Sequence, residues 1–459
     1  MIEKFHKNRL ITKYKKIREQ PDAPICLAPF NSLFFAPYGR IMSCWYNKRE
    51  PLGNYPENSI QEIWFGEKLE NLRKHLLKYD FSQGCEVCYA HLKKKNFYSV
   101  DANRYDYLAQ GDGNHPSSFE FQISHQCNFE CIMCNGELSS GVRQNREMMD
   151  MYKNPYDENF VIQLLPYLPY LKDAAFSGGE PFLNKIYFDI WEHLAQLNPE
   201  VKISLTTNGS ILNAKVKEYL NKLKFNISIS IDSLNEENYS LIRKNGDLQK
   251  MLDNFQYFLS YTREIGTSMS IKTCPMKQNI FEIPLILEFA NTQNVPVFFN
   301  TVIYPPNCTL INQKSEKLKE QIIFLKSYTF DNSENKCGNF NRYFALIQQI
   351  EGWYEDSIIR EKNYKNSVLN YEYFMKVVIK NVALFVNENS DFPAKVKNLK
   401  IMYYKDFLTE VFDLIVEEQT KLSAVKYLSE IPIFRLLSEI EFRDPQRLAD
   451  RLIYSNYND

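Results

Sequence analysis

The sequence lacks any apolar run that approaches the roughly 18 residues needed to cross a membrane. It also lacks an excess of charge, because 55 lysine and arginine residues stand against 56 aspartate and glutamate residues. This balance provides neither a global basic field for nucleic acid nor an acidic block typical of a disordered tail. The first residues, Met1 to Lys7, contain no apolar signal core. These absences predict a cytoplasmic protein with no membrane partner and no nucleic-acid partner.

The composition is that of an ordinary folded protein, with 44% apolar and 24% charged residues. A chain of 459 residues predicts about three domains and is long enough for a sizeable core. Ten cysteines in a reducing compartment indicate metal or redox sites rather than disulfides.

Three cysteines stand close together, at C-x3-C-x2-C spacing: Cys127, Cys131 and Cys134. They follow an alternating apolar run from Phe119 to Ser124, so we expect them on the loop after a strand. Three thiolates can bind three irons of a [4Fe–4S] cluster and leave the fourth iron open, as catalytic metal sites do. Taken alone, the spacing also allows a partial zinc site.

Three later segments follow this loop in order. Residues 176–181 read F-S-G-G-E-P, residues 204–209 read S-L-T-T-N-G, and residues 228–233 read S-I-S-I-D-S with Arg243 beyond them. Together with the cysteine spacing, these segments resemble the radical S-adenosylmethionine (SAM) superfamily. One difference is Met133, since members usually carry an aromatic residue just before the third cysteine.

The resemblance implies that SAM binds the open iron through its amino and carboxylate groups. The implied contacts are Gly178, Gly179 and Glu180 at the amino group, Asn208, Ser230 and Asp232 at the ribose, Arg243 at the carboxylate, and Met133 near adenine. It also implies that a reductant such as flavodoxin or ferredoxin supplies one electron. SAM then cleaves to methionine and a 5′-deoxyadenosyl radical that abstracts hydrogen from an unactivated carbon.

A second group of four cysteines precedes the first: Cys26, Cys44, Cys85 and Cys88. The turn at residues 37–40 predicts a hairpin that brings Cys44 back beside Cys26, and residues 59–77 predict an amphipathic helix. Four cysteines can complete either a zinc site or an iron–sulfur cluster.

The spacing of these four cysteines resembles the SPASM/twitch domains of radical SAM enzymes, which hold auxiliary [4Fe–4S] clusters. This implies two clusters in the chain, one that binds SAM and one auxiliary. In most relatives such a domain follows the barrel, whereas here it precedes it. The full SPASM pattern has seven cysteines, so the four present imply one fully ligated cluster that acts as an electron conduit.

The remaining chain alternates strands and helices and then becomes helical. Strands are expected at 119–124, 173–177, 201–207, 226–232, 268–273 and 296–302, with helices between them such as 156–170 and 185–197. This alternation predicts a parallel sheet with right-handed crossovers. Later helices are expected at 315–327, 342–354, 368–386, 402–417 and 421–440.

With the family resemblance, the fold class is α/β: a partial (β/α)6 TIM-like barrel, an N-terminal cysteine-rich α+β domain and a helical C-terminal region. The expected segments are a basic segment at 1–24, the auxiliary domain at 25–95, a linker at 96–117, the barrel at 118–305 and the helical region at 306–459.

Three cysteines belong to neither group. Cys274 ends the fifth expected strand, at the rim where a substrate would lie, and its thiol is a candidate hydrogen-atom donor or else a small buried apolar group. Cys308 and Cys337 carry weaker signals.

Three functions fit these patterns. The first is a radical SAM enzyme that modifies a peptide or protein, of the kind that matures ribosomal peptides. The second is a radical SAM dehydrogenase or related enzyme acting on a small molecule such as a sugar or cyclitol. The third is a non-catalytic Fe–S electron-transfer protein, against which the SAM-contacting motifs argue.

Overall fold

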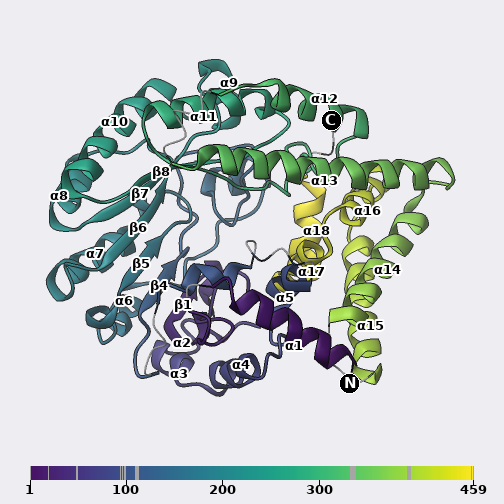
Figure 1. Ribbon diagram of the computed structural model, residues 1–459, viewed down its shortest axis with the longest axis horizontal. Helices are drawn as coiled ribbons and strands as arrows, with labels where there is room; N and C mark the ends of the chain where they lie inside the picture. The colour runs from purple at the N-terminus through teal and green to yellow at the C-terminus, as the bar shows by residue number, and fades with distance from the viewer. Residues whose placement is uncertain are drawn as a thin grey trace.

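A single open sheet organises the computed structural model, which describes residues 2–18, 20–47, 50–93, 95, 97, 100–108, 113–330, 337–389, 394–455 and 457. Within these residues the sheet has nine strands in the order β3-β2-β1-β4-β5-β6-β7-β8-β9 (Figure 1). From β4 onward its parallel strands are β4 (Ser118–Phe121), β5 (Asp173–Phe176), β6 (Lys202–Thr207), β7 (Phe225–Ser230), β8 (Met269–Thr273) and β9 (Val297–Phe299). All six were predicted. Because the edge strands β3 and β9 do not pair with each other, the prediction of a partial barrel is confirmed.

The two faces of the parallel strands differ in polarity. In β7 the buried residues Phe225, Ile227 and Ile229 alternate with half-buried Asn226, Ser228 and Ser230, and β6 and β8 follow the same pattern. The apolar face packs on the surrounding helices, whereas the face toward the barrel interior carries short polar side chains. Barrels filled with branched apolar residues have a packed interior. Short polar residues leave space here instead.

The cysteine-rich region extends this sheet. The predicted hairpin forms from β1 (Ser32–Phe35) and β2 (Arg40–Met42), with β3 (Gly53–Asn54) beyond it. Strand β1 pairs in parallel with β4, from Ser32 opposite Ser118 to Phe35 opposite Phe121. The second cysteine group (Cys26, Cys44, Cys85 and Cys88) is therefore held against the edge of the barrel.

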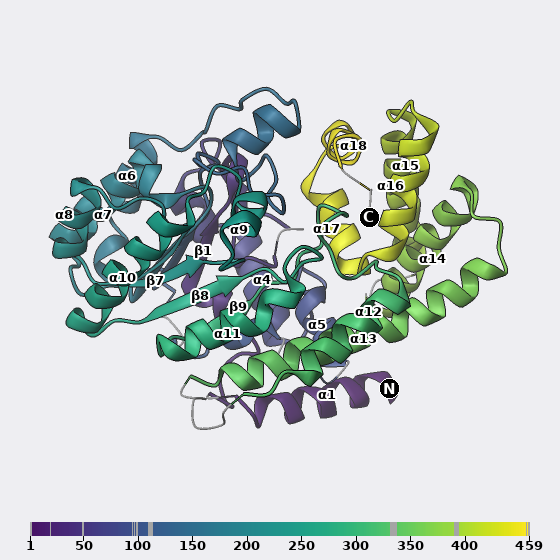
Figure 2. The same ribbon diagram turned by 90° about the horizontal axis from the view of Figure 1, so that it is seen from above.

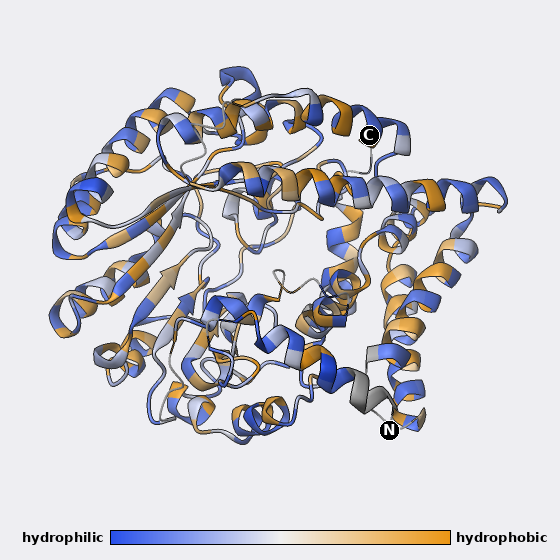
Figure 3. Cartoon of the chain, viewed as in Figure 1, coloured by the Kyte–Doolittle hydropathy of each residue, from blue (hydrophilic) through white to orange (hydrophobic). Residues whose placement is uncertain are grey.

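Helices flank the hairpin and cover the outer face of the barrel (Figure 1). They are α1 (Ile2–Lys15), α2 (Ala28–Asn31), α3 (Ile60–Trp64), α4 (Glu67–Leu77), α5 (Glu86–Lys93), α6 (Glu158–Leu164), α7 (Lys185–Leu197), α8 (Ala214–Lys222), α9 (Glu236–Ile242), α10 (Leu248–Ile265) and α11 (Ile283–Thr292). Most carry both polar and apolar residues along their length, as Figure 3 shows.

The single helix expected over 59–77 is wrong, because it divides into α3 and α4 at Gly66. A Cβ at Gly66 would lie 2.4 Å from the carbonyl oxygen of Glu62, so the close approach of the backbone at this break requires glycine.

The C-terminal region is helical as predicted. Its helices are α12 (Ser315–Ser327), α13 (Asn339–Lys365), α14 (Tyr371–Asn389), α15 (Ala394–Asp413), α16 (Glu418–Glu430), α17 (Ile433–Phe442) and α18 (Pro445–Ile453). The helix expected over 421–440 is instead two helices, since Pro432 cannot continue a helix in that direction.

Helices α14 to α18 surround a hydrophobic core of their own, which includes Phe374, Leu408 and Leu436. Figures 1 and 2 show this group beside the open side of the barrel, facing the strands. Among the described residues, none of the helices is both long enough and apolar enough to cross a membrane.

Candidate functional site

The loop after β4 carries Cys127, Cys131 and Cys134, and it is pinned by backbone contacts. The amide of Ile132 donates to the carbonyl of Ile242 (2.9 Å), the last residue of α9. The guanidinium of Arg146 donates to the carbonyls of Cys131 (3.2 Å) and Ile132 (3.1 Å). The loop therefore has a defined shape at the carboxyl end of the parallel strands, as expected.

Burial raises the pKa of all three thiols above the usual value, that of Cys134 to about 12, and neighbouring cysteines add to the effect at Cys127 and Cys134. Three thiolates this close together need a cation beside them, and the irons of a cluster would supply it. The three cysteines therefore fit as ligands of an iron–sulfur cluster. In the described part of the chain, no three His, Cys, Asp or Glu side chains are arranged to hold a single metal ion.

The glycine pair after β5 lies against the start of this loop. Gly178 and Gly179 both have positive φ, +84° and +57°. A Cβ on Gly179 would lie 2.2 Å from the carbonyl oxygen of Gln126, and that same oxygen accepts the amide of Glu180 (2.8 Å). The glycines expected at the SAM amino group thus also attach the end of β5 to the cysteine loop.

Glu180 is fully buried and joins two strand ends. Its carboxylate accepts hydrogen bonds from the amides of Phe182 (3.2 Å) and Asn208 (2.8 Å) and from the hydroxyl of Thr207 (2.8 Å). These contacts tie the end of β5 to the end of β6. The expected contact of Glu180 with the SAM amino group stays a prediction.

Burial raises the pKa of Glu180 to about 7, although its three donors and Arg243 act in the opposite direction. Between pH 4.5 and about 7 the folded state therefore holds a proton that the unfolded state has lost, so this group makes stability fall as pH rises. Relative to Glu180→Gln, the metal-free wild-type protein should lose at most about 3 kcal/mol of unfolding free energy over this interval. Urea unfolding of both proteins at pH 5 and pH 7.5 measures the difference, and parallel pH dependence would contradict it.

Asn208 connects β6 to the cysteine loop. Its amide nitrogen donates to the side-chain oxygen of Asn128 (3.0 Å), and its oxygen accepts from the amide (2.9 Å) and hydroxyl (2.6 Å) of Ser210. Asn128 in turn donates to the Ser210 hydroxyl (2.9 Å). Our sequence analysis missed Asn128, for which the available signal was its place directly after the first cysteine. The ribose contact of Asn208 stays a prediction.

Asp232 and Arg243, expected at different parts of SAM, form a buried ion pair. Their side chains lie 2.5 Å apart, and the Asp232 carboxylate also accepts the amide of Cys274 (2.7 Å). The guanidinium of Arg243 lies 3.9 Å from the sulfur of Cys131. The pair therefore connects β7, β8 and the cysteine loop, while Ser230, half-buried, ends β7.

Met133 and Cys274 meet in a small apolar cluster separate from the main core. They pack with Ile132 against buried Ile242, Met276, Val302 and Cys308. Burial raises the pKa of the Cys274 thiol, and the charge of Asp232 acts in the same direction. Cys274 thus lies near the cysteine loop, where a hydrogen-atom donor would be needed, but that role stays a prediction. The thiol of Cys337 instead contacts Asn294 (3.6 Å), before the start of β9.

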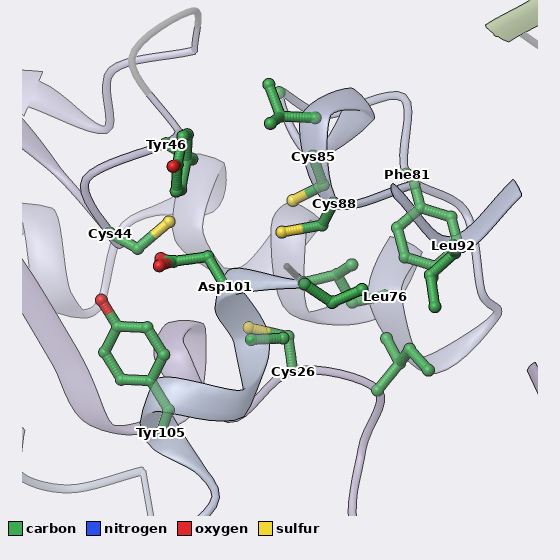
Figure 4. A pocket seen from close by; sticks show the side chains of 15 residues that line it. Cys26, Cys44, Tyr46, Leu76, Phe81, Cys85, Cys88, Leu92, Asp101 and Tyr105 are labelled. Carbon is green, nitrogen blue, oxygen red and sulfur yellow. The ribbon is translucent and has the colours of Figure 1, made fainter. Parts of the chain in front are cut away.

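The second cysteine group surrounds a pocket of its own. Cys26, Cys44, Cys85 and Cys88 line it together with Asp101, and their sulfurs point into a shared space (Figure 4). Burial raises the pKa of Cys26 and Cys88 to about 12. Four buried thiols around one space again fit a cationic iron–sulfur group.

A larger chamber of about 1030 Å³ fills the barrel interior. Its wall includes Ser118, Glu120, Asp173, Lys202, Ser204, Thr206, Ser228 and Lys272 from the sheet, Asn135, Glu137 and Leu138 after the third cysteine of the loop, and Tyr427, Arg435, Arg443 and Arg451 from the C-terminal helices. Tyr46, Asp101 and Tyr105 line both this chamber and the second cysteine pocket, so the two spaces share a wall. Asp101 and Tyr105 belong to the segment expected as a linker, parts of which lie outside the described residues.

The C-terminal helices are attached to the cysteine loop through Glu137. Its carboxylate pairs with Arg443 (2.9 Å) at the end of α17 and with Arg447 (2.9 Å) in α18. The helical region therefore closes the open side of the barrel over the chamber.

Both cysteine regions match known protein families. Residues 121–276 match the family model for the radical SAM superfamily, and residues 26–89 match the SPASM model, an iron–sulfur cluster-binding domain. The chain is 28% identical over 178 residues to a probable GTP 3′,8-cyclase of Methanocaldococcus jannaschii, which covers 39% of this chain and 56% of that protein. It is 26% identical over 176 residues to a GTP 3′,8-cyclase of Helicobacter pylori, which covers 38% of this chain and 52% of that protein.

The chain thus spans about half the length of these curated relatives. Among solved structures, it is similar to anSMEcpe with bound AdoMet, with a TM-score of 0.35 and 19% identity over 46% of this chain and 58% of the other. It is also similar to Streptococcus suis SuiB bound to the precursor peptide SuiA, with a TM-score of 0.35 and 17% identity over 60% of this chain and 53% of the other. The two family matches fall on the residues that carry the two cysteine groups, and they show that residues 121–276 belong to the radical SAM superfamily and residues 26–89 to the SPASM domains.

Proposed function

We propose that this chain is a radical SAM enzyme of the cytoplasm that modifies a peptide or protein. The observation that carries the proposal is the chamber of about 1030 Å³ beside the cysteine loop. It lies at the upper end of the range for small-molecule pockets, roughly 300–1000 Å³, and three parts of the chain wall it. Such a space suits a side chain together with the neighbouring residues of a polypeptide.

The cofactors proposed are one [4Fe–4S] cluster on Cys127, Cys131 and Cys134, SAM, and one auxiliary [4Fe–4S] cluster on Cys26, Cys44, Cys85 and Cys88. When bound and reduced, the first cluster and SAM would supply a 5′-deoxyadenosyl radical that takes a hydrogen atom from an unactivated carbon. For SAM we propose contacts from Met133, Gly178, Gly179, Glu180, Asn208, Ser230, Asp232 and Arg243.

The chain's own residues hold this site rigid and shielded. The Asp232–Arg243 pair and the Glu180 contacts lock the strand ends around the cysteine loop before any substrate arrives. The C-terminal helices, attached through Glu137, cover the open side of the barrel, and this cover would shield a reactive radical from side reactions.

The shared wall of chamber and second cysteine pocket supports an electron path between them. A substrate radical that loses one electron and one proton is oxidised by two electrons overall, counting the hydrogen atom already removed. Tyr46, Asp101 and Tyr105 lie between a substrate in the chamber and the four cysteines. The auxiliary cluster that these cysteines would hold would take up that electron. A flavodoxin- or ferredoxin-like reductant would supply the electron that starts each turnover.

A small-molecule substrate is the second candidate, because both curated relatives described above are named for a reaction of GTP. Sugars and cyclitols fall within the same candidate. A non-catalytic electron-transfer role is the third candidate, and it makes no use of a closed chamber beside the cysteine loop.

The test is anaerobic reconstitution with iron and sulfide, followed by SAM and dithionite. We expect 5′-deoxyadenosine to form, and more of it with a peptide substrate than with GTP or a cyclitol. Iron near eight atoms per chain is expected for two clusters, whereas about four irons with one zinc would assign zinc to the second site. If no 5′-deoxyadenosine forms with any of these substrates, the proposed radical SAM activity is contradicted.

A further inference from the structure

The acidic side chains on the sheet side of the chamber are already partnered. Glu120 pairs with Arg104 (2.9 Å) and accepts the hydroxyl of Tyr105 (2.5 Å). Asp173 accepts the hydroxyl of Ser118 (2.8 Å) and that of Tyr107.

The acidic side chains on the helical side are partnered too. Glu439 pairs with Arg443 (2.7 Å) and Arg451 (3.0 Å), and Glu137 pairs with Arg443 and Arg447 (both 2.9 Å). These four carboxylates, of Glu120, Asp173, Glu137 and Glu439, are therefore committed to cations or hydroxyls of the protein itself.

Lys272 is a cation on the same wall that has no such partner. It stands on β8 opposite Ser230 of β7, and its ammonium donates to the hydroxyl of Thr206 (2.8 Å). Among the described residues, no carboxylate lies within ion-pair distance of it. An ammonium has three donors, so two remain for a ligand.

This position is costly for an unpaired charge. Burial lowers the pKa of Lys272, and the nearby Arg104 lowers it further. Lys272 is half-buried, and a charge that has lost part of its contact with water destabilises the fold unless a counter-ion or a bound group compensates for it. The short hydroxyl side chains of Ser204 and Ser228 around it leave room for such a group.

Arg435 presents a second such cation from α17, on the opposite wall of the chamber. Its Nε is buried without a hydrogen-bond partner, and its guanidinium faces the ring of Phe434, 5.7 Å from the ring centroid. Within the part of the chain that the structure describes, no carboxylate forms an ion pair with it.

We propose that Lys272 is a specificity-determining residue that binds an anionic group of the substrate, a carboxylate or a phosphate, inside the barrel, with Arg435 as a second contact from the helical wall. This rests on the proposed function and narrows its substrate class: the modified polypeptide carries an acidic residue beside the site of reaction. A neutral substrate would leave Lys272 without a counter-ion.

The test is calorimetric binding to the anaerobically reconstituted protein. The probes are the peptide acetyl-Gly-Glu-Tyr-Glu-Gly-amide, its counterpart with glutamine in place of both glutamates, and pyrophosphate. A hydrogen bond to a charged group is worth about 1.5–3 kcal/mol. The wild-type protein should therefore bind the glutamate peptide about ten- to a hundredfold more tightly than the glutamine peptide. Lys272→Met should remove this preference, and Lys272→Arg should keep most of it.

Lys202→Met is the matched control, because Lys202 also lines the chamber but lies over the ring of Tyr107. It should retain the preference. Lys272-dependent binding of pyrophosphate in place of the peptide would support the proposal and assign the group to phosphate. Equal binding of acidic and neutral probes by the wild-type protein, no binding of any probe, or an unchanged preference in Lys272→Met would overturn it.

SAM cleavage is scored separately, so the two proposals fail in different ways. Charge-dependent binding without formation of 5′-deoxyadenosine would overturn only the proposed enzyme activity. Formation of 5′-deoxyadenosine without charge-dependent binding would overturn only the proposed anion site at Lys272.

Discussion

Replacing Cys127 with alanine should abolish the formation of 5′-deoxyadenosine. Cys127 is the first of three thiols on the loop after β4, and two thiolates cannot retain a cluster that needs three protein ligands to leave one iron open. The fold should survive, because among the described residues this thiol accepts one weak hydrogen bond, from the amide of Phe129 (3.4 Å). Iron should fall by about four atoms per chain and not by eight, because the auxiliary cysteines are untouched.

Cys337→Ala is the control for this substitution. Cys337 lies before α13 and contacts Asn294 near the start of β9, at the opposite end of the strands from the cysteine loop. It should leave both iron content and SAM cleavage unchanged. Turnover by Cys127→Ala at the wild-type rate would refute the assignment of this cysteine as a ligand.

Gly179→Ala should destabilise the protein and separate the end of β5 from the cysteine loop. A Cβ at this position overlaps the carbonyl oxygen of Gln126, 2.2 Å away, and the strained φ of +57° adds to the cost. Because the obstacle is backbone and not a flexible side chain, the hydrogen bond from Glu180 to Gln126 must break. We expect a loss of about 3 kcal/mol or more, with reduced iron in the reconstituted protein.

Gly266→Ala is the control that separates the two effects at Gly179, the overlap of the new Cβ with Gln126 and the strain of a positive φ. Gly266 ends α10 with a φ of +72°, and no heavy atom lies within 4 Å of a Cβ built there. Only the left-handed conformation is penalised, at about 1 kcal/mol. Chemical unfolding of the two variants measures the difference, and equal midpoints would show that the contact with Gln126 has no structural role.

Much of the barrel was predictable because its signals are local. Short runs of strand-forming residues between helical segments located the six strands β4 to β9, and the cysteine spacing placed three thiols on one loop, since both depend on neighbouring residues. The breaks at Gly66 and Pro432 were missed because amphipathic periodicity continued across them. The strict polar alternation of β6, β7 and β8 was also visible in the sequence, and it was the one available signal for the chamber.

The motifs by themselves determined that this chain carries a radical SAM domain and an SPASM domain. The partners of the individual side chains were decided only by the tertiary structure. Glu180 joins two strand ends, Asp232 pairs with Arg243, and Lys272 has no counter-ion. Each of these depends on how strands and loops meet in space, which no local pattern in the sequence encodes. The wall shared by the chamber and the second cysteine pocket likewise depends on tertiary contacts such as the pairing of β1 with β4, and hydrogen bonds between distant strands leave no periodic trace in the sequence.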